Sequence, residues 1–144
     1  MLHLEDITGE NWRIPVHVSE KQEKFVSNPM RLLARAYAYR NQGSFACMIY
    51  SDKEPVGMAL YYDCPELEAY DFSQLFIDEK YQGKGYGKEA AKMLIDRMRK
   101  EHKFNKIVLC YIEGNEVAKS MYESLGFNHT GAVDGDEVIM ELYL

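Results

Sequence analysis

Apolar residues alternate with polar ones or recur at helical spacing along most of the chain, and these patterns predict its elements. The predicted elements are, in order, a strand at 2–7, helices at 11–25 (interrupted near Pro15) and 29–40, strands at 44–50, 56–62 and 70–77, a helix at 86–100, a strand at 106–111, a helix at 116–125, and strands at 127–133 and 137–142. This order, β-α-α-β-β-β-α-β-α-β-β, predicts an α/β fold with a sheet of mixed direction. No repeat or linker divides the 144 residues, which predicts one domain over residues 1–144.

A glycine-rich segment lies where a strand passes into a helix. Residues 82–88 read Gln-Gly-Lys-Gly-Tyr-Gly-Lys, and the apolar run 75–77 ends five residues earlier. Glycines at such a turn let main-chain N–H groups approach an anion, and the first turn of the following helix adds free donors and the positive end of its dipole. The segment therefore predicts a site for a ligand that carries phosphate.

Two common phosphate-binding loops fit this segment poorly. A P-loop needs Ser or Thr after Gly-Lys, and Glu89 stands there instead. A dinucleotide-binding loop needs wider glycine spacing than that of Gly83, Gly85 and Gly87, followed by repeated βαβ units. A plain glycine-rich turn that only begins a helix remains an alternative for the segment taken alone.

A second motif follows the next strand. Asn115 is a suitable N-cap for a helix, Glu116 suits its first turn, and Gly126 suits the position just past its end. This arrangement of Asn, Ala, Tyr and Leu-Gly-Phe, together with the Gln-x-x-Gly-x-Gly loop before it, resembles the two signatures of the GNAT superfamily of acetyl-CoA-dependent N-acetyltransferases. The resemblance extends over essentially the whole order of elements, and it implies the GNAT fold, with a mixed, mostly antiparallel central sheet flanked by helices.

The resemblance also implies roles for particular residues. Tyr122 would protonate the departing CoA sulfur, although an ordinary buried tyrosine is the plainer interpretation of this residue alone. Acetyl-CoA would be the acyl donor, attacked directly by an amine. The residues implied to bind it are Leu75, Phe76, Ile77, Gln82, Gly83, Lys84, Gly85, Tyr86, Gly87, Lys88 and Asn115.

Composition narrows the class of protein. The three cysteines are widely spaced, with no C-x-x-C, and the four histidines do not cluster with them, which indicates reduced thiols in a cytoplasmic protein and no metal site. Cys110 is expected to be a buried, unreactive thiol. No apolar run is long enough to span a membrane, and no secretory signal is predicted. The net charge of −6 argues against nucleic acid as a partner.

The charge is unevenly distributed. Residues 54–79 hold seven acidic residues and no lysine or arginine, whereas residues 80–106 have a net charge of +6. The basic stretch suits the phosphates of coenzyme A, and the acidic stretch suits a cationic acceptor. Asp71, on the strand that leads to the apolar run, is the candidate general base. In the loop before that strand, Glu66 and Glu68 are candidates for binding an ammonium group, and Asp63 suits either role. Uneven surface charge alone also accounts for these carboxylates.

The sequence defines the acceptor amine less sharply than the acyl donor. Residues 16–28, 55–61 and 75–85 are similar to bacterial spermidine/spermine acetyltransferases, which makes a polyamine the leading small-molecule substrate. A peptide N-terminus, a lysine and an aminoglycoside remain alternatives, as does a non-catalytic module that senses acetyl-CoA. Many relatives are dimers, so a homodimer is a further open alternative.

Overall fold

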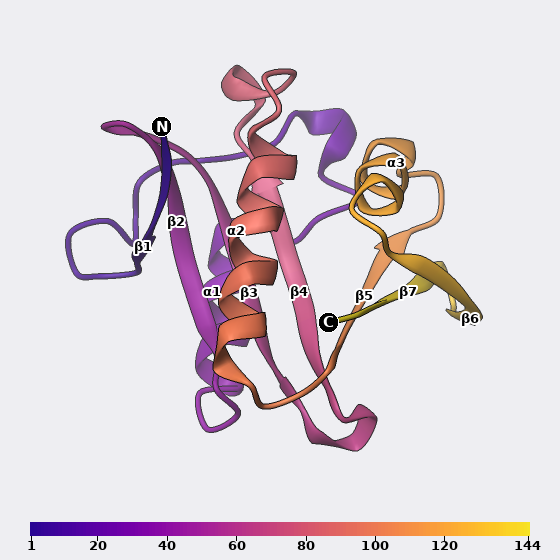
Figure 1. Ribbon diagram of the computed structural model, residues 1–144. Coiled ribbons are helices and arrows are strands. Elements are labelled where there is room, and N and C mark those ends of the chain that lie inside the picture. The colour runs from indigo at the N-terminus through magenta and orange to yellow at the C-terminus, as the bar shows by residue number, and fades with distance from the viewer.

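The computed structural model describes all residues, 1–144, and its centre is one sheet of seven strands in the order β1-β2-β3-β4-β5-β7-β6. Helix α2 covers one face of this sheet, α1 covers the other, and α3 stands beyond β5 (Figure 1). The strands are β1 (Leu2–Asp6), β2 (Phe45–Ser51), β3 (Glu54–Cys64), β4 (Ala69–Ile77), β5 (Lys106–Ile112), β6 (Asn128–Asp134) and β7 (Glu137–Tyr143). The helices are α1 (Pro29–Ala38), α2 (Tyr86–Glu101) and α3 (Glu116–Ser124), with 3₁₀ turns η1 (Glu20–Gln22), η2 (Pro65–Leu67) and η3 (Glu79–Tyr81).

The predicted α/β fold is confirmed, and only the β4–β5 pair is parallel. Two predicted helix starts are confirmed by their caps. The side chain of Asn28 accepts a hydrogen bond from the Arg31 N–H at 2.8 Å, and that of Asn115 accepts one from the Ala118 N–H at 3.2 Å. Each cap satisfies a donor that the first turn of a helix otherwise leaves free.

The predicted helix at 11–25 is wrong. The segment contains turns and the short η1: its local main-chain hydrogen bonds form isolated turns, and other polar groups bond to distant parts of the chain. The His17 N–H donates to the Asp78 carboxylate at 3.0 Å, and the His17 carbonyl accepts from the Glu79 N–H at 3.0 Å. Pro15, which has no N–H, weakens the helical alternative further.

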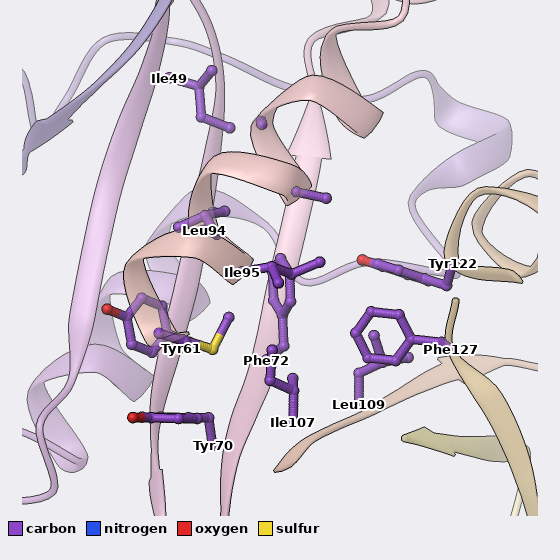
Figure 2. Packing of buried hydrophobic residues seen from close by; sticks show 14 of the residues in the cluster. Ile49, Tyr61, Tyr70, Phe72, Leu94, Ile95, Ile107, Leu109, Tyr122 and Phe127 are labelled. Atoms are coloured by element: carbon purple, nitrogen blue, oxygen red, sulfur yellow. The ribbon is translucent and has the colours of Figure 1, made fainter. Parts of the chain in front are cut away.

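The two faces of the sheet have separate cores. The larger core lies under α2 and includes Leu94, Phe72 and Ile107, and Figure 2 shows it extending to the ring of Tyr122 on α3. The smaller core lies under α1 and is built around Leu32, which is fully buried. None of the helices combines the length and apolar character that crossing a bilayer requires.

Two irregularities of β4 create the opening for a site. Tyr61 pairs with Phe72 and Leu60 with Gln74, so Ser73 is an extra residue that bulges from β4 and changes which side chains face each core. Strands β4 and β5 pair only at Tyr70–Ile107 and Asp71–Val108, and then diverge (Figure 1). The main chain of β4 beyond Asp71 therefore has no neighbouring strand on the β5 side.

Candidate active site

A cavity of about 630 Å³, here called the donor cavity, lies beside the end of β4. Its walls come from the last residues of β4, the glycine loop 82–88, the start of α2, and one face of α3. Ten of the eleven sequence-predicted cofactor residues line it: Leu75, Phe76, Ile77, Gln82, Gly83, Gly85, Tyr86, Gly87, Lys88 and Asn115. The eleventh, Lys84, does not line it, and its ammonium lies 5.8 Å from the centre of the Tyr81 ring.

The glycine loop has the geometry of an anion site. Gly83 and Gly85 both have φ of +81°, a conformation that other residues rarely adopt. A Cβ atom on either would meet no atom within 4 Å, so both glycines border open space. No side chain caps the start of α2, so no side chain occupies the donors of its first turn. Gly87 does not border this open space in the same way, because a Cβ atom there would lie 3.4 Å from the Met121 sulfur.

Side-chain hydrogen bonds hold the loop in place. The amide nitrogen of Gln82 donates to the Ile77 carbonyl at 2.8 Å and to the Gln22 side chain at 2.9 Å. Both of its N–H donors are thus used within the protein. Asp78 is almost fully buried and accepts from the main-chain N–H groups of His17 and Lys80, each at 3.0 Å. The strand end, the loop and the N-terminal segment are therefore linked.

A second cavity, of about 560 Å³ and here called the acceptor cavity, lies on the α1 side of β4. Three carboxylates line it, from Glu23, Asp71 and Glu137, and so do three cations, from Lys24, Arg31 and Arg35. The donor and acceptor cavities share six lining residues: Phe25, Val26, Leu75, Asn115, Ala118 and Tyr122. The two spaces therefore meet at Tyr122 and Leu75, where β4 has separated from β5.

Asp71 lies near the start of β4 and lines the acceptor cavity. Burial is the main influence on its carboxyl group and raises its pKa from the ordinary 3.8 to about 6. A hydrogen bond with Tyr62 and the positive charge of Arg35 lower this pKa, and the negative charge of Glu137 raises it. At neutral pH Asp71 is an ionised carboxylate basic enough to accept a proton.

Tyr122 lies on α3 at the junction of the cavities. Its ring packs edge-on against Phe72 and Phe127, with ring centres 6.1 and 5.5 Å apart (Figure 2). Burial, with a smaller contribution from Cys110, raises the pKa of its hydroxyl above the ordinary 10. The phenol therefore keeps its proton at neutral pH and is able to donate it.

Cys110 is not a buried core residue, contrary to the expectation from the sequence. It lies on β5 at the surface of the acceptor cavity, and its thiol donates to the Glu137 carboxylate at 3.2 Å. Desolvation, followed by this hydrogen bond, raises the pKa of the Cys110 thiol to about 12. The neutral thiol is a poor nucleophile.

The carboxylates predicted to bind the substrate ammonium lie elsewhere. Asp63, Glu66 and Glu68 surround the β3–β4 connection, and none of them lines either cavity. Asp63 forms an ion pair with Lys103 at 2.8 Å. No group of three or more His, Cys, Asp or Glu side chains is arranged to hold a metal ion.

The structure adds acceptor-cavity residues that sequence reasoning missed. Glu137 begins β7, which pairs with β5, and Arg35 on α1 donates to Ser73 at 3.1 Å. Tyr62 stacks on Tyr39 with ring centres 4.1 Å apart. No local motif marks these residues, because they come together only through the order of the strands.

Comparison with known proteins identifies the family and the fold of the chain. The sequence model of the acetyltransferase (GNAT) family matches residues 5–127. The chain is 29% identical to the spermine/spermidine N(1)-acetyltransferase of Bacillus subtilis (strain 168) over 153 aligned positions, covering 97% of both chains. An acetyltransferase from Thermus thermophilus superposes with a TM-score of 0.79 at 20% identity, covering 99% of this chain and 97% of that one. A Vibrio cholerae spermidine N-acetyltransferase, solved with CoA and spermine, gives 0.77 at 16% identity, covering 99% and 94%.

Proposed function

Because the chain belongs to the acetyltransferase (GNAT) family and is an acetyl-CoA-dependent N-acetyltransferase, we propose that it acetylates a primary amine of a polyamine such as spermidine or spermine. The observation that carries the proposal is the junction of the two cavities at Tyr122, with Asp71 on the acceptor side. We propose that residues 1–144 form a single catalytic domain.

The donor cavity suits acetyl-CoA along its length. The pyrophosphate binds the N–H groups of the glycine loop and of the first turn of α2, with Lys88 as a nearby positive charge. The pantetheine arm lies between the free edge of β4 at residues 75–77 and the apolar face of α3. An arm placed in this way brings the thioester to Tyr122.

The acceptor must lose a proton before it reacts. An amine of this type has a pKa of about 10.4 and is a cation at neutral pH, without the lone pair that attacks a carbonyl. Asp71 attracts the cation and takes one proton, directly or through a water molecule. Its raised pKa makes the carboxylate a stronger base than one in water.

Acyl transfer then needs no covalent enzyme intermediate. The amine nitrogen forms a bond to the thioester carbon, the carbon–sulfur bond breaks, and the departing thiolate takes the proton of the Tyr122 hydroxyl. The new amide nitrogen gives up its surplus proton, which restores the Tyr122 hydroxyl, and Asp71 releases to solvent the proton that it took from the ammonium group. Main-chain N–H groups on the free edge of β4 stabilise the oxyanion that forms between these steps. Holding both substrates in line at the junction supplies much of the acceleration.

Carboxylates on one face of the sheet support a polycation as acceptor. Asp71 lies on β4. Glu137 lies on β7, lines the same cavity and accepts a hydrogen bond from the Cys110 thiol on β5. A polyamine carries ammonium groups several bonds apart, so one nitrogen reacts near Asp71 while the next binds Glu137. The name of the Bacillus subtilis relative supports the same choice.

A second candidate acceptor is an amine that also carries a carboxylate, such as the N-terminus of an acidic peptide. Arg31 and Arg35, one helical turn apart on α1, line the acceptor cavity, and neither has a carboxylate partner within 4.0 Å. Two unpaired guanidinium groups favour an anionic group on the acceptor and disfavour a pure cation.

Release of the CoA thiol from acetyl-CoA separates these candidates. The panel contains spermidine, spermine, a lysine peptide, an acidic N-terminal peptide and an aminoglycoside. We expect saturable release with the polyamines, and a Glu137→Gln variant with a KM for spermidine raised about tenfold. Glu66→Gln is the matched control, because Glu66 lies outside both cavities, and its KM should not change. Release with the acidic peptide alone, or a raised KM in Glu66→Gln alone, would contradict the proposal.

A further inference from the structure

The side chain of Gln22 reaches from η1 to the glycine loop, sixty residues further along the chain. Its amide nitrogen donates to the Gln82 oxygen at 3.0 Å, and its oxygen accepts from the Gln82 nitrogen at 2.9 Å. The two side chains thus form a closed, reciprocal pair of hydrogen bonds. The Gln22 oxygen also accepts from the main-chain N–H of Ser19 at 3.3 Å, which holds Gln22 in place from its own side.

This pair completes a chain of contacts from η1 to β4. The second N–H of Gln82 donates to the Ile77 carbonyl at 2.8 Å, at the end of the strand whose edge faces the donor cavity. His17 reinforces the contact through its main-chain bonds to Asp78 and Glu79. The Gln82 side chain is therefore hydrogen-bonded both to η1 and to the end of β4, and these bonds fix the position at which the glycine loop begins.

The segment that contains Gln22 forms a wall shared by the two cavities. Val18 and Gln22 line the donor cavity, Glu23 lines the acceptor cavity, and Phe25 and Val26 line both. This wall contains only one short 3₁₀ turn, so its position depends on its contacts with the rest of the chain.

We infer that Gln22 is a positioning residue for acetyl-CoA binding, acting through Gln82. The reciprocal amide pair keeps the glycine loop in the conformation in which Gly83 and Gly85 border open space, and so prepares the loop for the pyrophosphate. Gln22 takes no part in the chemical step. The inference rests on the proposed pyrophosphate position at the glycine loop, and it does not depend on which amine is the acceptor.

Calorimetric titration with CoA tests the inference without any amine. Gln22→Ala and Gln82→Ala should each raise the Kd for CoA about five- to tenfold, because each loses the same partly exposed pair of neutral hydrogen bonds. The double variant should bind no more weakly than Gln82→Ala, since the two residues act as a unit. Lys21→Ala is the matched control, because Lys21 is an exposed residue of the same turn, and its Kd should match that of the wild-type protein.

Steady-state rates add a readout that general loss of structure would not give. With saturating substrates, kcat of Gln22→Ala should stay within about twofold of wild type while KM for acetyl-CoA rises. Unchanged CoA affinity in Gln22→Ala, or additive losses in the double variant, would overturn the inference. A Gly85→Leu variant separates an error about Gln22 from a misplaced pyrophosphate. If Gly85→Leu loses CoA binding, the loop is the pyrophosphate site and only the role of Gln22 is wrong. If Gly85→Leu also binds CoA normally, the loop is not the site.

Discussion

Replacing Asp71 with Asn should make the protein more stable and nearly inactive. Burial raises the pKa of Asp71 from the ordinary 3.8 to about 6, so the folded state resists its ionisation at neutral pH. At about 1.4 kcal/mol per pKa unit, this corresponds to at most about 3 kcal/mol of destabilisation above pH 6. Asn removes the charge but weakens the contacts with Tyr62 and Arg35, so we expect a net gain of about 1–2 kcal/mol at pH 8.

The pH dependence gives this prediction its sign. Because the folded-state pKa is raised, the contribution of Asp71 to stability is fully present below pH 3.8 and is lost as the pH rises through about 6. The stability difference between Asp71→Asn and wild type should therefore grow from pH 4 to pH 8. Urea unfolding at the two pH values measures it, and the comparison cancels groups common to both proteins.

Turnover of the same variant completes the test. We expect kcat/KM to fall by about two orders of magnitude at pH 7.5, because the general base is lost. A stability difference that is equal at pH 4 and pH 8 would refute the raised pKa. Wild-type turnover in Asp71→Asn would remove this residue from the mechanism.

Three further outcomes follow from the site. Tyr122→Phe should keep its affinity for acetyl-CoA and lose on the order of 10–100-fold in kcat, measured by thiol release with calorimetry as the binding control; unchanged kcat would exclude Tyr122 as the acid. Gly85→Leu should abolish CoA binding in a titration, because its side chain would enter the pyrophosphate space and strain a residue at φ of +81°. Glu137→Gln should lower the pKa of Asp71 and move the acid limb of the kcat/KM profile below pH 6, since the charge of Glu137 raises that pKa; a limb that moves upward would contradict the assigned electrostatics.

Local signals were sufficient for most of the fold. Asn28 and Asn115 mark helix starts because a cap is a contact within a few residues, and the strands show alternation or apolar runs of adequate length. The segment 11–25 was predicted wrongly because hydrogen bonds from His17 and Gln22 to residues about sixty positions away help to fix its conformation. Helical spacing of apolar residues carries no information about such partners.

The donor and acceptor cavities also differ in how far local sequence signals predicted their residues. Half of the twenty residues that line the donor cavity come from the continuous segment 75–88, so local motifs were enough to predict ten residues that line it. The acceptor cavity is built from α1, β4, β5 and β7, and Glu137 joins Asp71 there only because β7 pairs with β5. Glu66 and Glu68 were predicted because they are close to Asp71 in sequence, but they lie at the β3–β4 connection, outside both cavities.

A crystal structure with CoA and spermidine would show whether the two substrates meet at Tyr122. We expect the CoA sulfur within hydrogen-bonding reach of the Tyr122 hydroxyl, and a primary nitrogen of spermidine beside Asp71, close enough to the sulfur for direct transfer. Spermidine bound at the β3–β4 connection near Asp63, or CoA away from the glycine loop, would contradict this expectation.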